Sequence, residues 1–351
     1  MIHLAMTLAA LLVWSTSVAA QTAPQDVADA LAAYDAVPAA TAGRVTADDL
    51  AAAVAGTRLV DGSDMAALSD VWHVGSLTKS MTATLAARLV ADGLIQWDST
   101  IGEVLGEAFP QMQADWQDVT LTHLLTHGSG MEANLGRIRS ILLGDGPRAD
   151  YVREMLSNQP LEAPGGFAYS NAGYVVAGAM LEAVGEDSWE ALIEREVFAP
   201  LSMDSAGFGA PQGNVIEGHS RGLFGGLTPA GQGNGADNIP AMGPAGRVHL
   251  SAEDMLRYLR AHLLRDTGFL PDALWEDLHR AVGPEGYAMG WGVGEDGSLV
   301  HSGSNTLWYA VAYVDPAGGE AVFVAVNSGD LDQVAGPVDE ALRALLSHPP
   351  D

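Results

Sequence analysis

The sequence predicts an α+β fold, of an α/β sandwich-like kind, whose antiparallel sheet is built from both ends of the chain. Candidate strands near both ends are short and are separated by Gly, Asp and Pro turns. The middle of the chain contains mainly helices and loops. An antiparallel sheet from N- and C-terminal strands, flanked by terminal helices and joined to a central all-helical region, is the simplest arrangement of these elements.

The elements before residue 95 begin with a helix at 25–37, where apolar residues share one face. Residues 50–54 and 57–60 are predicted to be short strands. The clearest helix covers 76–91, because leucine or methionine recurs every four residues and Asp92-Gly93 ends it. This helix is therefore the most secure element of the N-terminal part.

Most of the remaining elements follow in two blocks. The predicted helices of the middle and of its end are 119–127, 150–157, 171–184, 188–198 and 251–264. The predicted strands after residue 285 are 287–293, 299–302, 307–314 and 321–326. A last helix is predicted over 337–346, with Pro337 in its first position. These blocks divide one domain, 21–351, into a sheet subdomain (21–95 and 265–351) and a helical subdomain (96–264).

The N-terminal residues 1–20 resemble a signal peptide. An apolar run from Leu4 to Trp14 is too short to span a bilayer, and Val18-Ala19-Ala20 fits a small-residue cleavage site. We therefore expect an exported protein, periplasmic or secreted, with no integral membrane segment after signal cleavage.

Composition excludes several classes of function. The 44 acidic residues outnumber the 16 basic ones, and the resulting net charge of −28 argues against nucleic acid or a membrane surface as a partner. The chain has no cysteine, which excludes disulfides, thiolate catalysis and Cys-ligated metals. Lys79 is the only lysine, beside 15 arginines, so its amine is expected to do something that a guanidinium cannot.

The first chemical motif is Ser76-Leu77-Thr78-Lys79, at the start of the clearest helix. The spacing places the hydroxyl and the amine one turn apart on the same face. A serine at a helix N-terminus also lies beside free backbone N–H groups, which can hold a developing oxyanion. A nucleophilic serine without a histidine base needs such an amine within hydrogen-bond reach.

Two further motifs add candidate catalytic and substrate-binding residues to Ser76 and Lys79. In Tyr169-Ser170-Asn171, an ammonium at about 4 Å would lower the phenol pKa of Tyr169 towards ~7, before desolvation opposes it. Asn171 would point the same way, towards Lys79 and a substrate carbonyl. In His301-Ser302-Gly303-Ser304, Gly303 would let a substrate backbone approach, and the Ser304 N–H would be a second oxyanion donor.

Together these motifs resemble those of the serine β-lactamase and penicillin-binding protein superfamily. The similar branch contains class C β-lactamases, D-Ala-D-Ala carboxypeptidases, D-aminopeptidases and related esterases, with the order SxxK, YxN and K/HxG. The resemblance covers about 70–340. The flanking segments that agree are WHVGSLTKSMTA, LTHLLTHGSG, YSNAGYVVAGAMLE, PLSMDSAGFG, AGRVHLSAEDMLRYL and YAMGWGV.

The resemblance implies a β-lactamase/transpeptidase-like fold and a serine hydrolase that works through an acyl-enzyme, without a cofactor, on a small-molecule or peptide substrate. Ser76 would be the nucleophile, and Lys79 and Tyr169 would share the acid–base work. The sequence leaves open which of the two takes the serine proton. Asn171 would orient substrate, and the N–H groups of Ser76 and Ser304 would form the oxyanion hole.

Two departures from the family pattern bear on the substrate. His301 replaces the lysine of class C β-lactamases, so a full charge for a substrate carboxylate is expected only below about pH 6.5. Ser302 replaces the usual threonine. An esterase or D-Ala peptidase-type activity is therefore favoured over strong β-lactam hydrolysis.

Other interpretations have less support. His123 and His127 have the spacing of a metal pair but lack a third ligand, so we predict no metal. Ser220 lies in a G-x-S-x-G match without the strand and helix that a nucleophile elbow requires. The glycine-rich stretch 222–235 reads as a loop rather than a dinucleotide site. A catalytically silent protein that binds peptidoglycan fragments or a partner is the alternative from another class.

Overall fold

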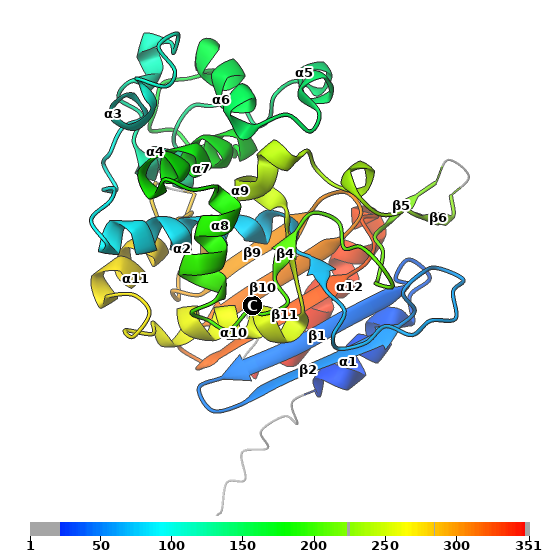
Figure 1. Ribbon diagram of the computed structural model, residues 1–351. Helices are drawn as coiled ribbons and strands as arrows, with labels where there is room; N and C mark the ends of the chain where they lie inside the picture. The colour runs from blue at the N-terminus through cyan, green and yellow to red at the C-terminus, as the bar shows by residue number, and fades with distance from the viewer. Residues whose placement is uncertain (1–21, 223–224, 284, 348–351) are drawn as a thin grey trace, which may run out of the picture.

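A six-stranded antiparallel sheet forms the base of the molecule (Figure 1). The computed structural model describes residues 22–222, 225–283 and 285–347, and the predicted signal peptide lies outside them. The sheet has the order β2-β1-β11-β10-β9-β8. Its strands are β1 (Ala39–Thr46), β2 (Leu50–Gly56), β8 (Gly292–Val293), β9 (Leu299–Ser304), β10 (Tyr309–Asp315) and β11 (Glu320–Val326).

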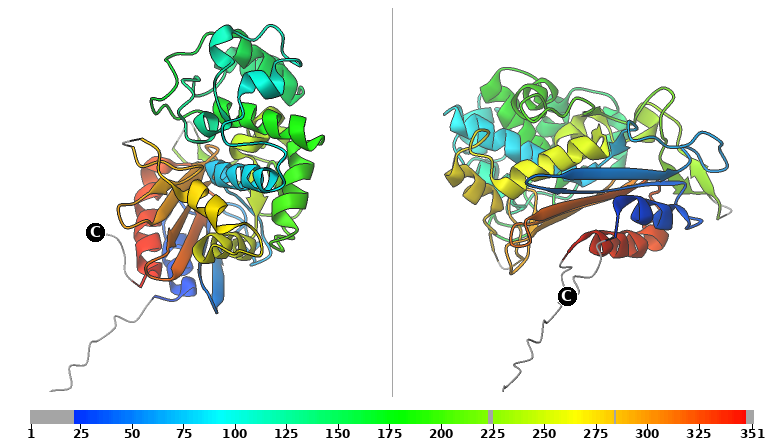
Figure 2. Two further views of the ribbon diagram at one scale, coloured as in Figure 1. Left: turned by 90° about the vertical axis from the view of Figure 1, so that its left-hand side faces the viewer. Right: turned by 90° about the horizontal axis from the view of Figure 1, so that it is seen from below.

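Both faces of this sheet are covered by helices. The terminal helices α1 (Pro24–Ala32) and α12 (Leu331–Leu345) lie together on the outer face (Figure 2). Their apolar residues pack against the alanines and valines of β1 and β11. Helix α10 (Ala252–Leu264) crosses β1 and β11 on the inner face. The predicted α+β class, with strands from both chain ends and flanking terminal helices, is confirmed.

Helix α2 (Thr78–Ala91), preceded by the short 3₁₀ helix η1 (Gly75–Leu77), lies between the sheet and the helical region (Figure 1). The other helices are α3 (Ile101–Leu105), α4 (Leu121–Leu125), α5 (Arg137–Leu143), α6 (Arg148–Ser157), α7 (Asn171–Gly185), α8 (Trp189–Ile193), α9 (Gly243–Gly246) and α11 (Asp272–His279). Short helical turns are η2 (Ala114–Trp116), the π-helical η3 (Glu194–Phe198), η4 (Asn234–Ala236) and η5 (Pro240–Met242). None of the helices in the described part of the chain is long and apolar enough to cross a membrane.

The sequence analysis predicted an all-helical central region, and this prediction is wrong because the region also contains strands. Strands β4 (Gly207–Phe208) and β7 (Val248–Leu250) pair with β3 (Trp72–His73) in a three-stranded sheet. Strands β5 (His219–Arg221) and β6 (Leu227–Pro229) form a hairpin, where a loop was predicted over most of that stretch. Strands of two or three residues are too short to show a period in the sequence.

One strand was missed, and two strand predictions were inaccurate. Strand β1 was missed, because three alanines and a glycine give it little strand propensity. It forms nevertheless, because it is the partner of both β2 and β11. Residues 57–60 leave the sheet after Gly56, and only 292–293 of the predicted strand 287–293 form β8. Pairing with distant strands, rather than local preference, decides these boundaries.

The last helix begins six residues earlier than predicted. Helix α12 starts at Leu331, and Pro337 lies inside it instead of at its first position. A proline inside a helix removes one backbone hydrogen bond. The buried face of α12 compensates, since Val334, Val338, Leu342 and Leu345 pack against the sheet.

Candidate active site

Ser76 and Lys79 lie next to each other at the junction of η1 and α2. Ser76 is half-buried, whereas Lys79 is completely buried. The Lys79 Nζ lies 3.0 Å from the Ser76 Oγ and donates a hydrogen bond of 2.6 Å to the carbonyl oxygen of Ala245. An accessible hydroxyl therefore touches an amine that has no contact with solvent.

The surroundings of Lys79 favour its neutral form. Burial lowers the pKa of the Lys79 amine well below its usual value. The rings of Tyr169 and Tyr174 lie beneath the amine, at 5.0 and 5.6 Å from Nζ to the ring centroids. A neutral amine keeps an N–H for the Ala245 carbonyl and presents its lone pair to the Ser76 hydroxyl. This is the arrangement that a general base requires.

Tyr169 reaches the same hydroxyl from the segment before α7. The Ser76 side chain lies close enough to the phenol to lower its pKa, although the residue as a whole is 38% exposed. Burial of the hydroxyl end has the larger effect and raises the pKa of Tyr169 to about 12. The expected fall towards 7 is therefore wrong in direction, because desolvation outweighs the other influences. At neutral pH the phenol keeps its proton and can donate it.

Asn171 is placed differently from the prediction. It is the first residue of α7, and its Nδ2 donates a hydrogen bond of 2.9 Å to the Oδ1 of Asn134. The polar contacts of Lys79 go to Ser76 and Ala245 instead. Asn171 thus lies beside Tyr169 in the chain but does not contact the amine as expected.

The Ser76 and Ser304 amides lie where β9 meets η1. A Cβ at Gly303 would come within 2.0 Å of the Val74 carbonyl oxygen and 2.6 Å of the Ser76 amide nitrogen. A Cβ at Gly75, whose φ is +51°, would come within 2.4 Å of the Ser304 amide nitrogen. Glycine is thus needed at both positions by contacts within the protein's own backbone. The approach of a substrate backbone at Gly303 stays a prediction. The two predicted oxyanion donors belong to segments in direct contact.

His301 is a buried, neutral group. Its Nδ1 lies 2.7 Å from the Ser302 carbonyl oxygen, which can only accept, so Nδ1 carries the proton and Nε2 accepts from the Tyr287 hydroxyl at 3.1 Å. Burial and then the nearby Lys79 lower the pKa of His301 to about 3. The predicted appearance of positive charge below pH 6.5 is therefore wrong, because desolvation was not visible in the sequence.

His127 is a site residue that the sequence analysis considered only as a metal ligand. Its ring packs against Tyr169, with 4.2 Å between centroids, and its Nδ1 accepts the backbone N–H of Ser170 at 3.0 Å. It has a φ of +59° and is fully buried. Burial, followed by Lys79 and His301, lowers its pKa to about 2. His127 thus positions Tyr169 in two ways: its ring packs against the tyrosine ring, and its Nδ1 holds the backbone at the next residue, Ser170. The sequence gives no signal for this contact, because the two residues are far apart in the chain.

The competing interpretations gain no support from the structure. The Nδ1 atoms of His123 and His127 both accept backbone N–H groups, which occupies a lone pair that a metal would need. Within the described ranges, no group of three or more His, Asp or Glu side chains is arranged to hold a metal ion. Ser220 lies on the β5–β6 hairpin, without the strand-to-helix turn of a nucleophile elbow.

A cavity of about 450 Å³ opens beside the site. It is lined by Tyr169, Tyr287, Gly292, Val300, His301, Ser302, Tyr309, Val311 and Asp339. None of these lining residues is a lysine or arginine, and the one carboxylate, on Asp339, is paired with Arg343 at 3.2 Å. The lining is therefore mainly aromatic, aliphatic and uncharged.

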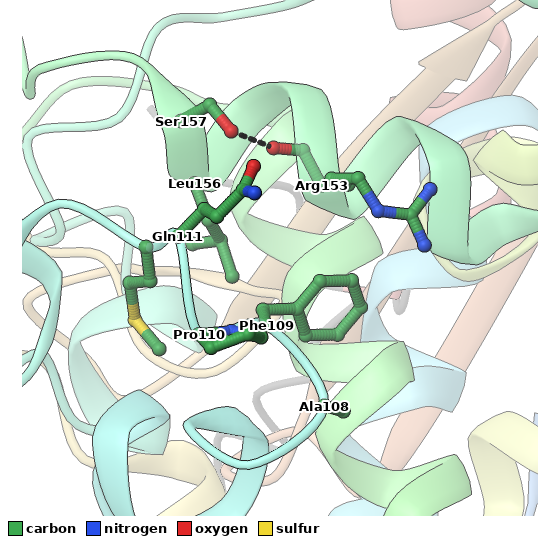
Figure 3. Close-up of a pocket in the computed structure, with 8 residues that line it drawn as sticks. Ala108, Phe109, Pro110, Gln111, Arg153, Leu156 and Ser157 are labelled. Carbon is green, nitrogen blue, oxygen red and sulfur yellow. Dashed lines mark hydrogen bonds between the residues drawn. The ribbon is translucent and has the colours of Figure 1, made fainter.

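A second cavity, of about 220 Å³, lies in the helical region (Figure 3). Phe109 and Arg153 form its wall, with the guanidinium carbon 5.8 Å from the ring centroid. Ser157, which also lines it, donates a hydrogen bond of 2.7 Å to the Arg153 carbonyl oxygen (Figure 3). None of the predicted site residues lines this second cavity, whereas Tyr169 and His301 line the first one, to which Ser76 and Lys79 do not contribute.

Comparison with known proteins is consistent with this geometry. A family model described as Beta-lactamase matches residues 69–346. The esterase EstB of Burkholderia gladioli is 30% identical over 78% of this chain and 81% of its own length. Penicillin-binding protein 4 of Amycolatopsis lactamdurans is also 30% identical, over 71% of this chain and 65% of its own. The octameric penicillin-binding protein homologue from Pyrococcus abyssi superimposes with a TM-score of 0.72 at 25% identity, over 88% of this chain and 73% of that one.

The state of His301 can be tested by NMR. Because its pKa lies at about 3, the imidazole should stay neutral throughout pH 5–8. The ring proton resonances of His301, assigned by their loss in His301→Asn, are expected not to move over that range. A titration step near pH 6.5 in those resonances would contradict the assignment of a buried, neutral ring.

Proposed function

The chain belongs to the beta-lactamase family, whose members are serine hydrolases, and we propose that it hydrolyses neutral esters or amides through an acyl-enzyme on Ser76. One observation carries this proposal. The Ser76 hydroxyl lies 3.0 Å from the buried amine of the only lysine in the chain. An exposed lysine amine could not serve as the base at neutral pH, because it would remain charged.

Acylation begins with Lys79 as the base. The neutral amine takes the Ser76 proton as the Oγ attacks the substrate carbonyl carbon. The carbonyl π electrons move to oxygen, and the N–H groups of Ser76 and Ser304 stabilise the resulting oxyanion. The Ala245 carbonyl accepts a hydrogen bond from the amine before and after it gains the proton, which keeps Nζ in place.

Tyr169 completes the proton balance. With a pKa of about 12 the phenol is protonated, and it donates its proton to the leaving oxygen or nitrogen as the tetrahedral intermediate collapses. The proton held on Lys79 then returns to Tyr169. In deacylation the neutral Lys79 amine takes a proton from the attacking water, and Tyr169 donates its proton to the Ser76 Oγ as the acyl bond breaks. The proton on Lys79 again returns to Tyr169, which restores Ser76 and releases the acid.

The lining of the cavity favours an uncharged substrate. Penicillins and D-alanyl peptides carry a carboxylate beside the scissile bond, and a buried carboxylate needs a cationic partner. The cavity lining has no lysine or arginine, and His301 is neutral above about pH 4. A neutral ester or amide avoids this desolvation cost. The similarity to the esterase EstB supports the same choice.

Export is a further part of the proposal. The apolar run and the small-residue site within residues 1–20 support a periplasmic or secreted enzyme. Hydrolysis of this kind needs only water and substrate, so it can proceed outside the cytoplasm.

The nucleophile is tested by mass spectrometry. Ser76→Ala should abolish labelling by a fluorophosphonate, because the hydroxyl that forms the bond is gone. Ser220→Ala is the matched control and should label as the unchanged protein does. Labelling that survives in Ser76→Ala and disappears in Ser220→Ala would assign the reaction to the hairpin instead. Folded, unchanged protein that no such probe labels would favour a silent binding protein.

The base is tested by Lys79→Arg. A guanidinium keeps its proton at any accessible pH, so it cannot accept one from Ser76. Acylation by an activated ester should fall by about a hundredfold to ten thousandfold, the usual contribution of a general base. Circular dichroism checks that the variant is folded. A folded variant that keeps more than a tenth of the acylation rate would refute the role of Lys79.

The substrate class is tested with a panel of four compounds. A short-chain p-nitrophenyl ester should be cleaved with a kcat/KM at least about tenfold above that for nitrocefin or a D-alanyl-D-alanine peptide, a difference of about 1.4 kcal/mol in transition-state binding. The p-nitrophenyl amide of a neutral acyl group serves as the second uncharged substrate. Faster turnover of nitrocefin than of the ester would reverse the proposed preference.

A further inference from the structure

Asp237, in the segment between η4 and η5, has a completely buried side chain that the proposed mechanism does not use. Its Oδ1 lies 3.0 Å from the His73 Nε2 and accepts hydrogen bonds from the Asn305 Nδ2 at 3.0 Å and the Asn238 amide at 2.7 Å. Its Oδ2 accepts from the Arg247 Nε at 3.1 Å. A buried carboxylate with this many partners has strictly defined surroundings.

The first connection leads to the nucleophile. His73 is buried on β3, and its Nδ1 accepts the backbone N–H of Gly75 at 3.2 Å. Because Nδ1 accepts, the ring proton is on Nε2, which faces the Asp237 carboxylate. The protonated Nε2 thus lies 3.0 Å from the Asp237 carboxylate, and Nδ1 holds the Val74–Gly75 peptide unit, which directly precedes the unit that carries the Ser76 N–H.

The second connection leads to the other oxyanion donor. Asn305 directly follows Ser304, at the end of β9, and is also buried. While its Nδ2 binds Asp237, its Oδ1 accepts the backbone N–H of Leu307 at 3.2 Å. The amide side chain therefore holds the turn after β9 in a single orientation.

The first connection ends at the Ser76 segment and the second at the Ser304 segment, and these two segments are in close backbone contact. The Gly75 and Gly303 positions leave no room for a Cβ, so the Ser76 and Ser304 segments touch without intervening side chains. Burial alone would raise the pKa of Asp237, but contacts with His73, Asn305 and Arg247 lower it. The carboxylate is therefore ionised and can interact with both His73 and Asn305.

We propose that Asp237 is a positioning residue that, through His73 and Asn305, aligns the N–H groups of Ser76 and Ser304 into one oxyanion hole. This inference rests on the proposed function, because an oxyanion forms only if Ser76 is acylated. An oxyanion hole acts only if both donors meet the oxygen at 2.7–3.1 Å. A displacement of about 1 Å can cost about a hundredfold in rate, so one carboxylate that holds both donors has a large effect on catalysis.

The test compares an ester with its thionoester, in which sulfur replaces the carbonyl oxygen. A hole shaped for oxygen prefers the oxoester, and a misaligned hole loses that preference. In Asp237→Asn the ratio of the two kcat/KM values should fall about tenfold or more, since one oxyanion donor contributes about a hundredfold to a thousandfold. His73→Phe and Asn305→Ala, which each cut one connection, should lower the ratio less than Asp237→Asn does. KM for the oxoester should change little.

The ratio is independent of the fraction of folded enzyme, because misfolded molecules cleave neither substrate. Ser205→Ala is the matched control: it removes a hydrogen bond to the buried Asp254, whose connections lead to Arg257 and not to the site. It should lower stability and leave the ratio unchanged. An unchanged ratio in both Asp237→Asn and His73→Phe would show that the network only stabilises the fold. Loss of the proposed function itself has a different signature, namely full activity in Ser76→Ala.

Discussion

Lys79 is held without solvent between the sheet and the helical region, and the catalytic proposal depends on that burial. An exposed ammonium would keep its proton and would only attract the serine hydroxyl electrostatically. Burial removes the hydration that stabilises the charge, so the amine becomes a base at the distance where a base is needed. The Ala245 carbonyl then provides orientation, and Tyr169 and Tyr174 cover the amine with aromatic faces. Fold and reactivity are therefore linked at one side chain.

Site contacts between residues close together in the sequence were predictable, whereas contacts between distant residues were not. The Ser76–Lys79 pair was predictable because a helix fixes residues three apart on one face. Tyr169 and His301 were placed through a resemblance of motif order. The role of His127 and the connections of Asp237 were not predictable, because each depends on contacts between segments more than 40 residues apart. The direction of the pKa shift of Tyr169 was misjudged, and the lowering of the His301 pKa was not anticipated. The reason is related, since desolvation belongs to the assembled site and not to any segment.

The same division holds for the fold. Helices α2, α7 and α10 have strong local patterns, and they form close to where the sequence predicts them. Strand β1 is alanine-rich and has no such pattern, yet it pairs with both β2 and β11 along the sheet. Pro337 indicated a helix start, but the apolar face of α12 extends the helix in front of it. Long-range packing prevails over local preference wherever the local preference is weak.

The solitary, enclosed lysine also has a practical consequence. The folded chain offers no ε-amine on its described surface, so succinimidyl reagents can modify only its α-amino group. Attachment to a solid support through such chemistry would give every molecule the same orientation. Unfolding uncovers Lys79, so uptake of a second label counts unfolded molecules directly.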